Sequence, residues 1–134
     1  MNIPKIDHIG IMVKDLEAAK RTYSEGLGLK LAKEEINEAH GLKVAFFSCG
    51  EVMIEVIEPI GPGIAMDFVE QIGGGVHHVC FAVDDADAAF AEIKAGNILD
   101  SFMPAPVTGA AGSKVFFLSP ETIHNAQIEF AQHA

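Results

Sequence analysis

The stretch DHIGIMVKDLEAA, which covers residues 7–19, returns in diverged form as HHVCFAVDDADAA at residues 77–89. The two stretches are offset by 70 residues, and most of their 13 aligned positions pair identical or apolar side chains. Self-similarity at a fixed offset is typical of a repeated supersecondary unit. The chain is therefore predicted to be a tandem duplication. The identical positions are His8/His78, Val13/Val83, Asp15/Asp85, Ala18/Ala88 and Ala19/Ala89.

Each copy is predicted to begin with a strand and a helix. Residues 6–13 are rich in Ile and Val, and the matching residues 76–83 share this character, which favours a strand in each copy. Asp15 in the first copy, and Asp84 or Asp85 in the second, can then act as a helix N-cap. Apolar residues recur at helical spacing after each cap, and glycine ends each helix.

Three strand-like runs follow each predicted helix. The last runs match between the copies, because IEV at residues 54–56 corresponds to IEF at 128–130, and VAFF at 44–47 corresponds to VFFL at 115–118. The predicted fold class is α+β, with two tandem βαβββ modules. The predicted runs cover residues 29–36, 43–49 and 52–58 in the first copy and 98–102, 114–118 and 126–131 in the second.

A short connector is predicted to join the modules. Residues 64–72 have the apolar spacing of an amphipathic helix, and three glycines follow at 73–75. We expect one domain of two half-modules, at about residues 1–60 and 76–134, joined by this helical, Gly-rich segment. Residues 104–113 are rich in Pro, Gly and Ala and are expected to form a mobile loop.

Composition excludes several classes of function. The chain has 134 residues and a formal net charge of −10, without the clustered Lys and Arg of a nucleic-acid or anionic-membrane binder. It has no apolar run of about 18 residues and no N-terminal leader pattern, so a cytoplasmic protein that does not cross a membrane is expected. Cys49 and Cys80 lie in apolar runs and are expected to be two reduced, buried thiols.

Four residues recur in equivalent positions of the modules and are candidate metal ligands. His8 and His78 lie in the first strands, and Glu55 and Glu129 lie in the last strands. A carboxylate inside a β core is unfavourable unless it is paired or coordinates a cation. If the modules pack about a pseudo-twofold axis, the four side chains converge, and two imidazoles with two carboxylates suit a divalent ion. An octahedral ion would keep two positions for water or substrate, as catalytic sites do.

The other histidines are assigned no metal role. A single His on a strand is more often structural, and His77 is expected to point away from its neighbour His78. His40, His124 and His133 are expected in loops or in the C-terminal tail.

The sequence resembles the vicinal oxygen chelate (glyoxalase-like) superfamily, and within it most closely the methylmalonyl-CoA epimerases. The resemblance implies paired βαβββ modules that form a half-open, β-barrel-like cavity around a metal site, and it implies a homodimer. It places the family's metal ligands on His8, Glu55, His78 and Glu129, for a divalent ion such as Co, Zn, Mn or Ni. The matching stretches are IDHIGIMVKDLEAA, YSEGLGLKL, HGLKVAFFSCG, IEVIEP, GGGVHHVCFAVDDADAA, GAAGSKVFFLSPE and IEF.

The function implied by this resemblance is metal-dependent epimerisation of an acyl thioester. Such an enzyme interconverts methylmalonyl-CoA stereoisomers by removing and returning the proton alpha to the thioester carbonyl, and Glu129 is the expected base. The alternative is a lactoylglutathione lyase of the glyoxalase I type, which shares the ligand pattern and acts on a glutathione hemithioacetal. A dioxygenase, which normally uses two His and one carboxylate, and a non-catalytic binding or resistance module are further candidates.

Two positions depart from the epimerase pattern. Val44 stands where some relatives carry a second cavity glutamate, so the second acid or base is unassigned, with water or Glu38 as candidates. Gln127 is expected to face the cavity and to make it more polar. A phosphorylated ligand would need a local basic patch in this acidic chain. The candidate residues for that patch are Lys5, Lys30, Lys33, Lys43 and Lys114.

Overall fold

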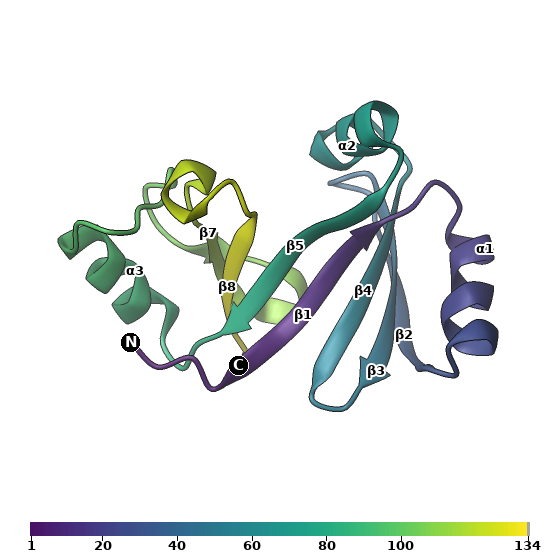
Figure 1. Ribbon diagram of the computed structural model, residues 1–134, viewed down its shortest axis with the longest axis horizontal. Helices are drawn as coiled ribbons and strands as arrows, with labels where there is room; N and C mark the ends of the chain where they lie inside the picture. The colour runs from purple at the N-terminus through teal and green to yellow at the C-terminus, as the bar shows by residue number, and fades with distance from the viewer. Residues whose placement is uncertain (134) are drawn as a thin grey trace. The chain divides into compact units, whose positions relative to one another are not determined.

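The computed structural model describes residues 1–133 and divides into two compact units. The first unit comprises His8–His77. The second unit comprises Met1–Asp7 together with the chain from His78 onward. Each unit contains a four-stranded arrangement and a helix on one face of it (Figure 1). The boundary at His78 falls close to the start of the second predicted copy.

The first unit follows the predicted element order. Its strands are arranged as β2-β3-β4-β1, with β1 parallel to β4 and the other neighbours antiparallel. A π-helical turn at Thr22–Gly26 extends α1. The bounds are β1 Lys5–Met12, α1 Leu16–Arg21, β2 Lys30–Asn37, β3 Leu42–Cys49, β4 Val52–Pro59 and α2 Ile64–Ile72.

The second unit repeats this topology. Its strands are arranged as β5-β8-β7-β6, with β5 parallel to β8 and the other neighbours antiparallel. The βαβββ duplication predicted from the repeat is therefore confirmed. The bounds are β5 Gly75–Ala82, α3 Ala86–Ala95, β6 Val107–Thr108, β7 Lys114–Phe117 and β8 Ile128–Gln132, with 3₁₀ turns at Ala110–Gly112 and Pro120–Ile123.

The second strand of the second unit was placed wrongly. Residues 98–102 form no strand, and the strand of this position is the two-residue β6, within the segment expected to be a loop. Ser101 explains the difference, because its hydroxyl donates to the Phe117 carbonyl and its own carbonyl accepts from Lys94. These bonds anchor the buried Ser101, while Ile98 and Phe102 are exposed, so the run forms a loop in place of a strand ladder.

Matched caps start the two helices. Asp15 accepts a hydrogen bond from a backbone amide of α1 at 3.2 Å, and Asp85 accepts one from α3 at 3.0 Å. The choice between Asp84 and Asp85 is therefore settled in favour of Asp85. A side chain from the last strand of each module also accepts a hydrogen bond from the backbone at the start of the helix. Glu58 accepts from the first amide of α1 at 2.7 Å, and Gln132 accepts from the first amide of α3 at 2.8 Å.

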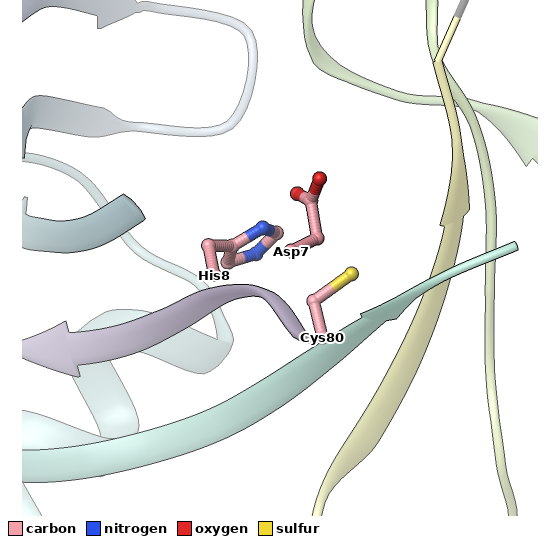
Figure 2. Close-up of side chains that lie close together, drawn as sticks. All are labelled: Asp7, His8 and Cys80. Atoms are coloured by element: carbon pink, nitrogen blue, oxygen red, sulfur yellow. The ribbon is translucent and has the colours of Figure 1, made fainter. Parts of the chain in front are cut away.

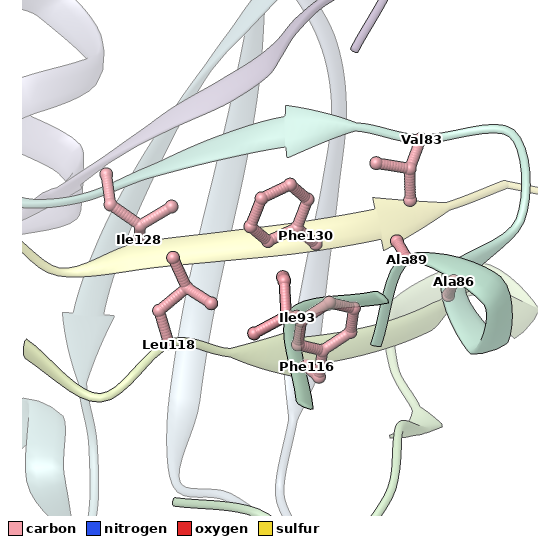
Figure 3. Packing of buried hydrophobic residues seen from close by; sticks show 8 residues of the cluster. All are labelled: Val83, Ala86, Ala89, Ile93, Phe116, Leu118, Ile128 and Phe130. Atoms are coloured by element: carbon pink, nitrogen blue, oxygen red, sulfur yellow. The ribbon is translucent and has the colours of Figure 1, made fainter. Parts of the chain in front are cut away.

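The cores show which face of each sheet is buried against its helix. In the second unit α3 packs on Phe116 and Phe130, whose rings stack at 5.1 Å (Figure 3). In the first unit Leu16 of α1 packs on Phe47 and Val56. Because side chains alternate along a strand, the residues between these core positions face away from α1 and α3. We call that opposite surface of each sheet the ligand face.

The connector helix α2 has the predicted bounds and covers part of the ligand face of the first unit. Its Ala65 and Val69 pack in one cluster with Val44, which is 5% exposed. Three consecutive glycines with positive φ follow α2. A Cβ at the second of them, Gly74, would lie 2.8 Å from the Met12 carbonyl oxygen, so this close approach requires glycine.

Two further expectations concern membranes and thiols. Across residues 1–133, each helix is too short or too polar to cross a membrane.

The two cysteines differ in burial. Cys80 is fully buried, as predicted. Cys49 is exposed, contrary to prediction, because it lies at the end of β3 where the chain turns at Gly50.

Candidate metal centre

The first unit pairs one imidazole with one carboxylate on its ligand face. His8 lies on β1 and Glu55 on the parallel neighbour β4. His8 Nε2 and Glu55 Oε1 are 3.7 Å apart, and the side chains are 14% and 15% exposed. Gly10 and Phe46 flank Glu55 on the adjoining strands.

The second unit repeats this pair in a more buried setting. His78 lies on β5 and Glu129 on the parallel neighbour β8. His78 Nε2 and Glu129 Oε1 are 3.5 Å apart, and the side chains are 8% and 11% exposed. Cys80 and Phe117 flank Glu129 on the adjoining strands, and the ring of Phe117 meets His78 edge-on at 6.5 Å.

The separations within the two pairs are close to those of two ligands of one cation. They exceed the usual range of an N–H···O hydrogen bond. Two atoms bonded to one ion at roughly 2.0–2.2 Å lie about 2.8–3.6 Å apart at octahedral or tetrahedral angles. The second pair, at 3.5 Å, lies within this range, and the first pair, at 3.7 Å, lies just above it. The donors are also appropriate, since imidazole and carboxylate are ligands that Co, Zn, Mn and Ni accept. A largely buried carboxylate gains from such an ion, because the ion replaces the water that Glu55 and Glu129 lose.

The remaining histidines lie away from these pairs. His77 makes an edge-on contact with Phe68 of α2 at 5.0 Å, on the face opposite to His78. His40 follows β2, where its backbone N–H and ring approach the Asn37 side chain. His124 ends the 3₁₀ turn after β7 with a positive φ.

Asp7 belongs to a cluster that the sequence analysis missed. Its carboxylate accepts a 2.7 Å hydrogen bond from His133 Nε2, and it lies within 4.8 Å of the Cys80 sulfur (Figure 2). The sequence predicts His133 in the C-terminal tail, with no metal role. Period-two alternation does place Cys80 on the face of His78. The sequence contains no comparable signal that Asp7 and His133 meet.

The two positions that depart from the epimerase pattern have distinct surroundings. Val44 is buried beneath α2, so the second cavity glutamate of some relatives is replaced by a core residue. Gln127 precedes β8 and is exposed, and its backbone carbonyl accepts from Val79. The predicted start of this strand at residue 126 was therefore two residues early. Glu38 lies exposed in the turn after β2.

Comparison with known proteins finds one family over most of the chain. A sequence model described as Glyoxalase/Bleomycin resistance protein/Dioxygenase superfamily matches residues 7–117. An ethylmalonyl-CoA/methylmalonyl-CoA epimerase of Cereibacter sphaeroides is 33% identical, over 97% of this chain and 98% of the relative. The mitochondrial methylmalonyl-CoA epimerase of Homo sapiens is 32% identical, over 98% of this chain and 75% of the relative.

Solved structures of such enzymes share the fold. The methylmalonyl-CoA epimerase of Mycobacterium tuberculosis superimposes with a TM-score of 0.90 at 26% identity, over 98% of this chain and 89% of the other. A variant of the Streptomyces coelicolor methylmalonyl-CoA epimerase, in complex with 2-nitronate-propionyl-CoA, gives 0.88 at 28% identity, with 99% of both chains covered. The predicted α+β fold class and the resemblance are both confirmed. The relatives described above are named as epimerases, which are isomerases.

Proposed function

Because the chain belongs to the Glyoxalase/Bleomycin resistance protein/Dioxygenase superfamily, we propose that it is a metal-dependent methylmalonyl-CoA epimerase. The observation that carries the proposal is the repeated His–Glu pair, which each module presents on the face opposite to its own helix. Similarity to named epimerases over nearly the full length supports the choice of reaction.

The proposed cofactor is one divalent ion held jointly by His8, Glu55, His78 and Glu129. Each pair alone offers two ligands, and a cation with two pairs keeps positions for substrate oxygens. When bound, the ion would supply Lewis-acid stabilisation of the negative charge that develops on a thioester carbonyl oxygen. Co, Zn, Mn and Ni all suit these donors.

Glu129 is the proposed base. Epimerisation breaks the α C–H bond, with the proton passing to Glu129 and the electron pair moving into the C–C bond towards the carbonyl. The same carbon then takes a proton on its other face from a second donor, for which water and Glu38 are the candidates. A carboxylate in an apolar setting accepts such a proton without competition from bulk water. Phe117, Cys80 and Ala131 provide that setting around Glu129. The Glu55 pair is more open and is assigned to binding.

Deuterium exchange tests the proposal directly. The purified protein is incubated with methylmalonyl-CoA in deuterated water, with and without a chelator. We expect inversion at the α carbon and incorporation of one deuterium, both lost with the chelator and restored by added Co or Zn. If the metal-loaded protein neither inverts nor exchanges the substrate, the proposed function is wrong.

The alternative function is tested in the same preparation. A lactoylglutathione lyase would convert the hemithioacetal of methylglyoxal and glutathione, and it would leave methylmalonyl-CoA unchanged. The repeated ligand pair is compatible with that reaction too. Turnover of the hemithioacetal without thioester exchange would therefore replace the epimerase by the lyase.

Assembly and location complete the proposal. The resemblance supports a homodimer, and light scattering after gel filtration measures it. A cytoplasmic location is proposed as well, and fractionation of the source cells checks it. Nucleic acid and membranes are not proposed partners of this acidic chain.

A further inference from the structure

A β-bulge in the edge strand of the first unit brings two lysines to the same face. On β2, Lys30 pairs with Ser48 of β3, and Lys33 pairs with Phe46, although these partners are only two residues apart. The extra residue shifts the register between Leu31 and Lys33. Without it, lysines three positions apart would point to opposite faces. Both side chains therefore stand on the ligand face.

Each lysine stands at one end of a row of register-paired residues across the sheet, and each row contains a proposed metal ligand. The row of Lys33 crosses Phe46 to reach Glu55 on β4. The row of Lys30 crosses β3 and β4 to reach His8 on β1. With strands about 4.8 Å apart, Lys33 stands roughly 10 Å from Glu55 and Lys30 roughly 14 Å from His8.

The Lys33 ammonium has a defined position within its row. Its Nζ lies 4.7 Å from the centre of the Phe46 ring, which is a cation–π distance. Phe46 is itself only 7% exposed and belongs to the cluster under α2. A buried ring thus fixes the charge at the edge of the ligand face, two strands from Glu55, while Lys33 remains exposed to solvent.

Other lysines of the chain already have carboxylate partners that balance their charge. Lys20 bonds to Glu34 and Lys114 bonds to Asp87, and these carboxylates raise the pKa of their lysines. Within residues 1–133, neither Lys30 nor Lys33 has a carboxylate in ion-pair range, including Glu35 on the same strand face. In a chain of net charge −10, two uncompensated lysines together on one face call for an anion.

We propose that Lys30 and Lys33 bind the phosphate groups of the coenzyme A part of the substrate. The inference rests on the proposed function, which places the acyl end at His8 and Glu55. Ammonium groups suit phosphate as mobile point charges. The span across three strands separates the two ends of the ligand and leaves the intervening surface, lined by Ser48 and Met53, for the pantetheine arm.

Truncation of the substrate tests the assignment. The double variant Lys30→Gln/Lys33→Gln is compared with wild type on methylmalonyl-CoA and on the pantetheine thioester, which lacks the nucleotide phosphates. We expect KM for the CoA ester to rise about fivefold to tenfold, because each partly exposed ion pair contributes modestly. KM for the pantetheine ester and both kcat values should stay at wild-type levels. Added salt should weaken CoA-ester binding by the wild type more than by the variant.

Lys43→Gln is the matched control. Lys43 also has no ion pair among the described residues, but its register partners, Ile36 and Glu58, lie on the face that carries α1. This variant should leave both KM values unchanged. An equal rise on both esters, or no rise in the double variant, overturns the phosphate assignment.

Calorimetric binding of free coenzyme A separates this inference from the proposed function. If wild type turns over no thioester, the function is wrong, but the lysine pair is still tested. Binding that weakens in the double variant and not in Lys43→Gln supports the site. A wild-type protein that does not bind coenzyme A, or equal binding by all three proteins, overturns it.

Discussion

The two modules share a topology and a His–Glu pair, but they surround that pair differently. In the first module Glu55 lies between Gly10 and Phe46, and the lysines of β2 stand at the edge of the same face. In the second module Glu129 lies between Cys80 and Phe117, and its side chain is 11% exposed against 15% for Glu55.

This contrast shows what a duplication can keep and what it can change. The strand positions that deliver imidazole and carboxylate are fixed by the sheet and its alternation, so they survive divergence in both copies. The neighbouring positions are free to specialise. The proposed function assigns proton transfer to the second module, where the setting of Glu129 is apolar, and the binding of an anionic substrate to the first.

The largest expected effect is a loss of kcat, and it should differ between substitutions of Glu129 and Glu55. Glu129→Gln should lower kcat about 10²- to 10⁴-fold, because it removes the group that moves the proton. Glu55→Gln removes a ligand of the same kind but no proton-transfer group, so saturating metal should bring kcat to within about tenfold of wild type. Epimerisation and deuterium uptake are measured at saturating metal, with bound metal determined in each protein. Equal losses of kcat at equal metal content would remove the assignment of roles to modules.

The second-largest expected effect is a rise in Tm on metal binding, and it tests whether both modules bind the same ion. A divalent ion at a hundred times its Kd stabilises the folded state by about 2.7 kcal/mol. For a chain of this size, that corresponds to a rise in Tm of roughly 10 °C. His8→Ala and His78→Ala should each abolish most of this rise, whereas His40→Ala should keep it. Thermal unfolding with and without Zn or Co measures the shift. A shift that survives one of the two ligand substitutions would show that a single module binds the ion.

Features that depend on local pattern were predicted correctly from the sequence. The repeat gives the module order, alternation puts the four candidate ligands opposite the helix-packing residues, and apolar spacing followed by three glycines delimits α2 at Ile64–Ile72. These signals are contained in short windows, where the period of the side chains decides the structure. The four candidate ligands are therefore the part of the site most accessible to sequence analysis.

Features that depend on partners distant in sequence were missed. The bulge between Leu31 and Lys33 exists only relative to β3, so the shared face of the β2 lysines does not appear in the sequence. Asp7 and His133 bond across 126 positions. The run at residues 98–102 looked like a strand, but hydrogen bonds of Ser101 hold it as a loop.

The smallest expected effect concerns the second helix cap of each module. Glu58 and Gln132 stand three positions after Glu55 and Glu129, on the opposite strand face, and each accepts from the first amide of its helix. Replacement by Ala leaves that amide without its acceptor. The charged Glu58 should cost about 1.5–3 kcal/mol of unfolding free energy, and the neutral Gln132 about 0.5–1.5 kcal/mol.

Urea unfolding of the two Ala variants measures this order, with Glu70→Ala on the exposed surface of α2 as the control. Exchanging the acceptors sharpens the comparison. Glu58→Gln keeps the hydrogen bond but removes the charge that favours a helix N-terminus, so it should lose only a part of the Ala effect. Gln132→Glu should stabilise the second module by a similar amount. If Gln132→Ala costs more than Glu58→Ala, then packing around the cap, and not its charge, sets the difference between the modules.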